Sequence, residues 1–123
     1  MKTKITDRKK GQVTIIDIVG NLTIGVGDVA LREKVNELLD AGRRLFIFNM
    51  KDVPFMDSAG LGESVACKKR ICERGGAVKL VTPRGTKPLE IFVVAGLEKA
   101  FEIFDDEEEA LASFIPSGVG QEW

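Results

Sequence analysis

Histidine and tyrosine are absent from this 123-residue chain, and cysteine occurs only twice. Without histidine, the sequence lacks the usual general base for an activated serine and the commonest metal ligand. Cys67 and Cys72 fall in one predicted helix, where a spacing of five turns their side chains to different sides, so we expect free thiols rather than a disulfide. These absences disfavour a hydrolase and a zinc site. We expect a protein that is not an enzyme and needs no cofactor.

Neither sign of charge dominates, because 18 lysines and arginines stand against 19 aspartates and glutamates. The charges are intermixed, so there is no basic stripe for nucleic acid and no polybasic arm for anionic lipid. No segment approaches the run of about 18 apolar residues that predicts a membrane span, and the polar first ten residues lack the apolar region of a signal peptide. We therefore expect a cytoplasmic protein that binds neither DNA nor a membrane directly.

Apolar periodicity predicts one α/β domain in which strands and helices alternate. The predicted strands are 13–19, 22–24, 44–50, 77–81 and 100–104. The first two are expected to pair antiparallel across Gly20-Asn21, whereas 44–50 should run parallel to its neighbour because a helix connects them. The predicted helices are 28–41, 58–74, 86–95 and 105–115. The result is a mixed central sheet of four to five strands with about four helices packed against it.

The predicted domain spans residues 11–115, with a polar N-terminal segment at 1–10 and a flexible tail at 116–123. A chain of this length can bury roughly two-thirds of its unfolded surface, which is enough for a core without disulfides or metal. Helix N-caps are predicted at Asp28, Ser58, Thr86 and Asp105, the last in a capping box with Glu108. The helical side chains predicted to face the core include Leu61, Val65, Ala66, Cys72, Leu89, Phe92 and Val93.

Two clusters of charge have structural interpretations. Acidic residues 105–109 suit the first turn of a helix, so they do not require a metal site. The basic group near the end of helix 58–74 is interpreted as a solvated face or the rim of an interface; its members are Lys68, Lys69, Arg70 and Arg74. Residues 25–27, Gly-Val-Gly, form a turn, because they lack the further residues of a dinucleotide fingerprint or a P-loop.

The most informative segment is 55–62, Phe-Met-Asp-Ser-Ala-Gly-Leu-Gly, where a buried strand gives way to a helix. Ser58 is predicted to be the N-cap, with its Oγ accepting from backbone N–H groups of the first turn. Asp57 beside it adds negative charge at the positive end of the helix dipole. A phosphoryl group on Ser58 would face free donors. The simpler interpretation is that Ser58 caps the helix and does nothing else.

Two glycines in this helical turn require an explanation. Gly60 and Gly62 each sacrifice about 0.5–1 kcal/mol of helix stability relative to alanine. Either the turn packs tightly on the sheet, or its bare backbone gives a partner protein close access to Ser58. The sequence leaves both explanations open.

Residues 49–62 resemble the signature of STAS domains, the family of bacterial anti-sigma factor antagonists, and the predicted element order from about residue 10 to 115 is similar to that family throughout. The resemblance implies a STAS fold and a binding module. It further implies that Ser58 is phosphorylated by a serine kinase that is itself the anti-sigma factor, and that the phosphorylated form no longer binds it. A PP2C-type phosphatase would reset the switch, and the free protein is expected to be a monomer.

The resemblance also indicates which residues meet the partner. These expected partner-binding residues are Asn21, Thr23, Phe55, Met56, Asp57, Ala59, Gly60, Leu61 and Gly62. Phe55 and Met56 are expected to edge a flat apolar patch. One departure concerns Thr23, because phosphorylatable family members often carry an acidic residue near this position.

Two alternatives remain open at this point. In one, the chain is a STAS scaffold whose serine is never phosphorylated, an interpretation that Thr23 favours. In the other, the start of the Ser58 helix binds a small anion or nucleotide and the domain acts as a sensor.

Overall fold

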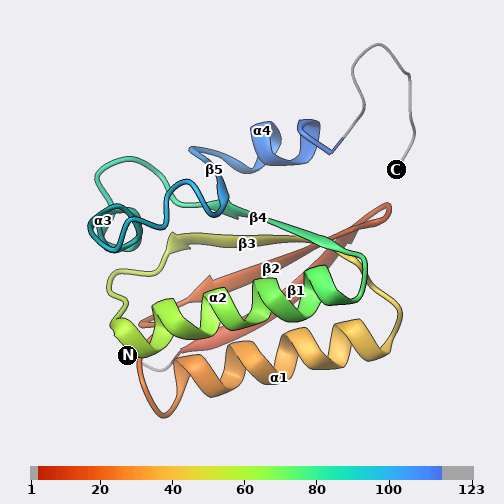
Figure 1. Cartoon of the computed structure of the whole chain (residues 1–123), viewed down its shortest axis with the longest axis horizontal. Coiled ribbons are helices and arrows are strands. Elements are labelled where there is room, and N and C mark those ends of the chain that lie inside the picture. Colours follow the sequence, from red (N-terminus) through yellow and green to blue (C-terminus); the bar gives the residue numbers. More distant parts are fainter. Residues whose placement is uncertain (1–2, 115–123) are drawn as a thin grey trace.

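The computed structural model describes residues 3–114 and contains a five-stranded sheet flanked by helices (Figure 1). The elements are β1 (Lys4–Lys10), β2 (Val13–Val19), α1 (Gly27–Asp40), β3 (Leu45–Asp52), α2 (Ser58–Glu73), β4 (Ala77–Val81), α3 (Lys87–Val94), β5 (Glu102–Phe104) and α4 (Glu107–Ala112). The strand order is β1-β2-β3-β4-β5. The β1–β2 pair is antiparallel, and the other three pairs are parallel. The predicted mixed α/β fold, including the parallel pairing of β3, is confirmed.

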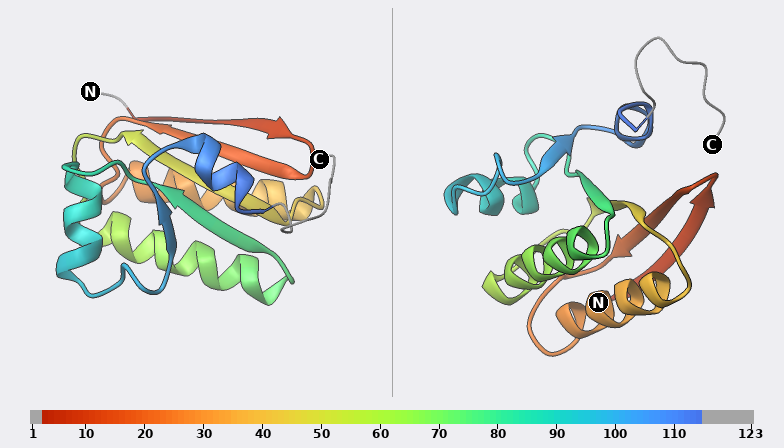
Figure 2. Two further views of the ribbon diagram at one scale, coloured as in Figure 1. Left: turned by 90° about the horizontal axis from the view of Figure 1, so that it is seen from above. Right: turned by 45° about the vertical axis from the view of Figure 1, so that its right-hand side comes forward.

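The sheet separates two apolar layers. Helices α1 and α2 lie side by side on one face, whereas α4 lies on the other (Figure 2). Successive residues of β3 point to opposite faces, so Phe46 and Phe48 enter the larger cluster with α1 and α2, and Ile47 enters the smaller cluster under α4. The continuous apolar run of β3 therefore reflects burial on both faces.

The pairing at the N-terminal edge differs from the prediction. Residues 1–10 were expected to lie outside the domain, but Lys4–Lys10 forms β1 and pairs with β2 from Lys4 opposite Val19 to Lys10 opposite Val13. The predicted strand 22–24 is wrong, because this segment forms only an isolated parallel bridge between Leu22 and Met56. Lysines suit an edge strand because they discourage pairing with another chain, and they hide the usual apolar signal of a strand.

Several helix caps and side-chain orientations also differ. Helix α1 begins at Gly27, and its N-cap, Val26, makes no side-chain cap bond. The cap of α4 is Asp106 rather than Asp105, since its Oδ1 accepts from the Glu109 N–H at 2.8 Å. Thr86 does occupy the N-cap position of α3, but its hydroxyl donates to the Pro83 carbonyl instead of accepting a cap bond. The side chains predicted to be inward but found exposed are Val65, Cys72 and Val93.

The end of the chain is outside the described part. Helix α4 was predicted to extend to residue 115 and a tail to follow, and both Ile115 and residues 116–123 lie beyond the described residues. None of the helices in residues 3–114 combines the length and the apolar composition of a membrane-spanning segment.

Candidate functional site at the start of α2

The segment that follows β2 packs closely between the first turn of α1 and the first turn of α2. Leu22 is fully buried, and its N–H donates to the Phe55 carbonyl at 3.0 Å. A Cβ placed on Gly27 of α1 would lie 2.8 Å from the Leu22 Cα, and one placed on Gly60 of α2 would overlap the Leu22 carbonyl oxygen. Close backbone approach therefore explains Gly60, although the contact is with this segment rather than with the sheet itself.

Gly62 behaves differently from Gly60. A Cβ at Gly62 would meet no heavy atom within 4 Å, and the residue is exposed. Packing inside the described fold does not require a glycine at this position. The two glycines of the motif thus have separate explanations, and only Gly62 leaves bare backbone open to solvent.

Asp57, not Ser58, is the N-cap of α2. Its backbone is extended, with φ −99° and ψ −176°, and its Oδ1 accepts from the Gly60 N–H at 2.9 Å. Its Oδ2 accepts from the Ile24 N–H at 3.0 Å. The prediction that Ser58 caps the helix is wrong because the neighbouring carboxylate offers two acceptor oxygens to donors on two sides, which a single hydroxyl cannot do.

Ser58 is the first helical residue, and it is exposed. Among residues 3–114, no group is hydrogen-bonded to its hydroxyl. The expected partner-binding residues around it divide by burial. Phe55 and Gly62 are exposed; Asn21, Thr23, Asp57, Ala59 and Leu61 are half-buried; Met56 and Gly60 are buried.

Met56 was expected to edge an apolar surface patch. That prediction is wrong, because Met56 is 0% exposed. It belongs to the larger core cluster, and its backbone bridges to Leu22. The local extended geometry turns consecutive side chains to opposite sides, so Phe55 points outward with 47% of its surface exposed.

Sequence reasoning placed an apolar patch at Phe55 and Met56 but missed the exposed apolar side chains of Ile24, Val26 and Val65. Ile24 and Val26 are 73% and 59% exposed, and the Ile24 backbone is bonded to the residue that precedes Ser58. Val65 is 38% exposed and follows Ser58 by seven residues, which places it on the same side of α2. The signal that could have revealed this surface was the pair of apolar residues flanking Gly25 in a turn. We refer to Ile24, Phe55 and Val65, with Val26, as the apolar surface.

Comparison with known proteins agrees with the fold. Residues 4–110 match the family model of the STAS domain. The chain belongs to the STAS domain family. It is 34% identical over 88 residues to the anti-sigma-B factor antagonist of Bacillus subtilis (strain 168), an alignment covering 72% of this chain and 78% of that protein.

Solved structures extend the likeness in fold to most of the chain. A Thermotoga maritima protein described as a candidate anti-sigma factor antagonist superposes with a TM-score of 0.80 at 24% identity, covering 89% of this chain and 92% of that chain. Bacillus SpoIIAA in its phosphorylated form superposes with a TM-score of 0.67 at 22% identity, covering 92% and 99% of the two chains. At such identities the likeness shows a shared fold.

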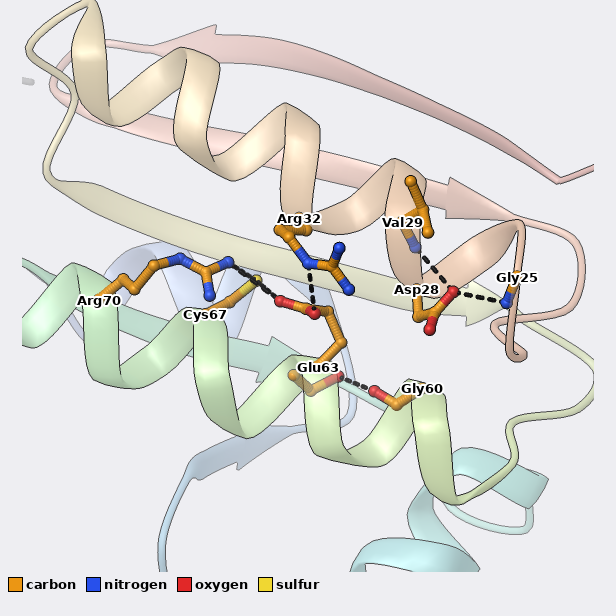
Figure 3. Close-up of polar contacts among 9 residues, drawn as sticks. Gly25, Asp28, Val29, Arg32, Gly60, Glu63, Cys67 and Arg70 are labelled. Atoms are coloured by element: carbon orange, nitrogen blue, oxygen red, sulfur yellow. Dashed lines mark hydrogen bonds and ion pairs between the residues drawn. The ribbon is translucent and has the colours of Figure 1, made fainter.

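A buried carboxylate joins the two long helices of this STAS domain (Figure 3). Glu63 of α2 is 8% exposed and accepts from Arg32 of α1 at 2.9 Å and from Arg70 at 3.0 Å. The Cys67 thiol donates to the same carboxylate at 3.4 Å, and burial raises the pKa of Cys67 to about 12, so it stays protonated. This cluster has a structural role, fixing α2 against α1.

The basic group of α2 also makes internal contacts. Lys68 donates to the Ala100 carbonyl and lies 5.0 Å from the centroid of the Phe101 ring, and Arg74 is 3.8 Å from Asp40. The solvated-face interpretation is therefore incomplete, since Lys68 contacts the segment that precedes β5 and Arg74 contacts α1. In the described part of the chain, no group of three or more candidate side chains could hold a metal ion.

Burial disfavours the charged form of Asp57 and is the largest single influence on it. The N–H groups of Gly60, Ile24 and Ala59 outweigh that effect, so the pKa of Asp57 lies below its ordinary value. The charged carboxylate is therefore the form that the site stabilises.

Replacing the cap should give a pH-dependent loss of stability. At pH 7 we expect Asp57→Ala to lower the free energy of unfolding by about 1–2 kcal/mol. Because the folded-state pKa of Asp57 is depressed, its contribution is complete above the unfolded-state pKa, near 4, and is lost as pH falls through the folded-state value. Urea unfolding of both proteins from pH 7 to pH 2.5 measures this difference. A difference that stays constant down to pH 2.5 would contradict a charge-dependent cap.

Proposed function

We propose that this STAS domain binds an anti-sigma factor with serine-kinase activity and is switched off by phosphorylation of Ser58, so that it regulates sigma-factor-dependent transcription. The observation that carries the proposal is the position of Ser58, exposed at the first residue of α2 and beside the apolar surface. The named B. subtilis relative, an anti-sigma-B factor antagonist, supports the kind of partner.

The mechanism is a change of charge in a surface that must lose water to bind. Phosphorylation adds about −1.5 to −2 charges at pH 7. Against a closely packed partner and next to the Asp57 carboxylate, that charge opposes docking through desolvation and like-charge repulsion. The domain itself tolerates the phosphate, because the positive end of the helix dipole favours a negative charge at this position. The switch therefore needs no refolding.

Thr23 keeps the scaffold alternative open. Thr23 is half-buried and precedes Ile24 in the chain. The Ile24 N–H donates to the Asp57 carboxylate, so this part of the site already has a negative charge without an acidic residue at position 23. This arrangement favours the switch. If Ser58 is nevertheless never modified, the domain acts as a scaffold that binds by shape alone.

The first experiment is intact-mass analysis with peptide mapping of the protein isolated from its own cells. The hypothesis predicts phosphate on Ser58, with a PP2C-type phosphatase able to remove it. Ser64 is an internal control, because it is buried and its hydroxyl donates to the Gly60 carbonyl at 2.9 Å. Complete absence of phosphate across growth and stress conditions would favour the scaffold.

The sensor alternative has its own readout. A thermal-shift screen with nucleotides should leave the protein unchanged under the switch hypothesis. A ligand present at a hundred times its Kd would instead stabilise the fold by about 2.7 kcal/mol, and such a result would favour the sensor.

A further inference from the structure

We propose that the Asp57 carboxylate is a latch that holds the apolar segment 24–26 beside Ser58, and that a phosphate on Ser58 weakens the latch. The inference rests on the proposed function, because it concerns how the same site is regulated. Phosphorylation would then change the docking surface in two ways, by adding charge at Ser58 and by loosening a second segment that carries two of its exposed apolar side chains.

The latch has two arms from one side chain. Oδ1 of Asp57 accepts from Gly60 at 2.9 Å, inside α2, and Oδ2 accepts from Ile24 at 3.0 Å, in a segment 33 residues earlier in the chain. A carboxylate bonded to N–H donors makes charge-assisted bonds, which are stronger than neutral ones. One side chain thus links the start of the helix to the apolar segment.

One backbone–backbone hydrogen bond holds segment 24–26 among the described residues: the Ala30 N–H of α1 donates to the Val26 carbonyl at 2.9 Å, at the end of the segment away from Ile24. Leu22 just before it is fixed by burial between Gly27 and Gly60, but the side chains of Ile24 and Val26 are 73% and 59% exposed and gain little from packing. Gly25 has a φ of 92°, a left-handed conformation that favours glycine and suits a turn. The polar attachments of the segment therefore decide where its apolar side chains lie.

The second polar attachment comes from α1. Oδ1 of Asp28 accepts from both Gly25 and Val29 at 2.8 Å, as Figure 3 shows. This bond stays within one stretch of chain, so it shapes the turn without tying it to α2. Asp57 alone of these two aspartates connects the segment to the helix that carries Ser58.

A phosphate on Ser58 would compete with the latch. It would sit one residue from Asp57, where a second negative charge disfavours the carboxylate. It would also be near the N–H groups of the first turn, including that of Gly60, which one arm of the latch already uses. Both effects weaken the hold of Asp57 on Ile24.

The test uses the full chain alone, with phosphoserine installed at position 58 during translation, and compares it with the unmodified protein and with Asp57→Asn. An asparagine still caps a helix but offers one acceptor oxygen in place of two, so it cannot keep both arms. We expect amide hydrogen exchange at Ile24 to be about tenfold faster in both altered proteins, with a lower NMR order parameter at Ile24 and Gly25.

Asp28→Asn is the matched control. It removes the same charge from the neighbouring aspartate but keeps the single Oδ1 that makes both of its bonds, so Ile24 exchange should stay unchanged. Unchanged exchange in the phosphoprotein and in Asp57→Asn would overturn the latch. If Ile24 exchange is faster in Asp57→Asn but not in the phosphoprotein, the latch exists but phosphate on Ser58 does not regulate it. Since no partner is present, either failure leaves the proposed binding switch to be judged by its own binding assay.

Discussion

Phosphorylation of Ser58 should weaken binding to the proposed anti-sigma kinase at least a hundredfold, a loss of about 3 kcal/mol, whereas Ser58→Ala should bind as tightly as the unmodified protein. The reason is that, in the proposed complex, the new charge would enter an interface that includes Ile24 and Phe55, which are 73% and 47% exposed in the free protein. Calorimetry at fixed ionic strength measures the three affinities. Ser58→Asp should show the same direction with a smaller loss, because it carries one charge on a shorter side chain.

A charge placed elsewhere separates a local effect from a change in net charge. Ser113 is exposed and immediately follows α4, on the opposite face of the sheet from α2. Ser113→Asp adds the same charge as Ser58→Asp, yet it should leave the affinity within about twofold. Equal binding by the phosphorylated and unmodified proteins, or an equal loss from Ser113→Asp, would rule out a charge switch at Ser58.

The sequence predicts the parallel core of this fold well and its N-terminal edge poorly. The continuous apolar run of β3 and the terminating glycines after α2 lie in segments that are buried or sharply bounded, so local pattern and tertiary structure agree there. Strand β1 lies at the edge of the sheet, where lysines discourage pairing with another chain. Its pairing with β2 follows from the tight turn that joins the two strands, and an alternating apolar pattern does not reveal it.

At the site, the sequence singles out the correct turn but not the roles within it. Asp57 and Ser58 are both favourable N-cap residues, and the decision depends on Ile24, a donor 33 residues away that no local pattern reveals. The buried cluster of Glu63 with Arg32 is likewise a contact between helices. Long-range contacts of this kind follow from how the elements pack, so they become visible only in the folded structure.

Gly60→Ala should be the most damaging conservative change in the site. The new Cβ would overlap the Leu22 carbonyl oxygen and lie 2.9 Å from Cγ of Met56, so backbone would have to move. Overpacking of this kind costs about 3 kcal/mol, and the better helix propensity of alanine returns about 1 kcal/mol. We expect a net loss of about 2 kcal/mol in the free energy of unfolding and a Tm lower by about 8 °C, measured by urea and thermal unfolding.

Gly62→Ala is the matched control, because it makes the same substitution two residues along α2 where a Cβ meets nothing within 4 Å. The higher helix propensity of alanine is then the only effect of the substitution on stability, so the free energy of unfolding should rise by up to about 1 kcal/mol. If the variant is more stable but binds the anti-sigma kinase more weakly, the bare backbone at Gly62 serves partner approach, since the fold itself gains from the change. Equal destabilisation by both substitutions would contradict the separate roles of the two glycines.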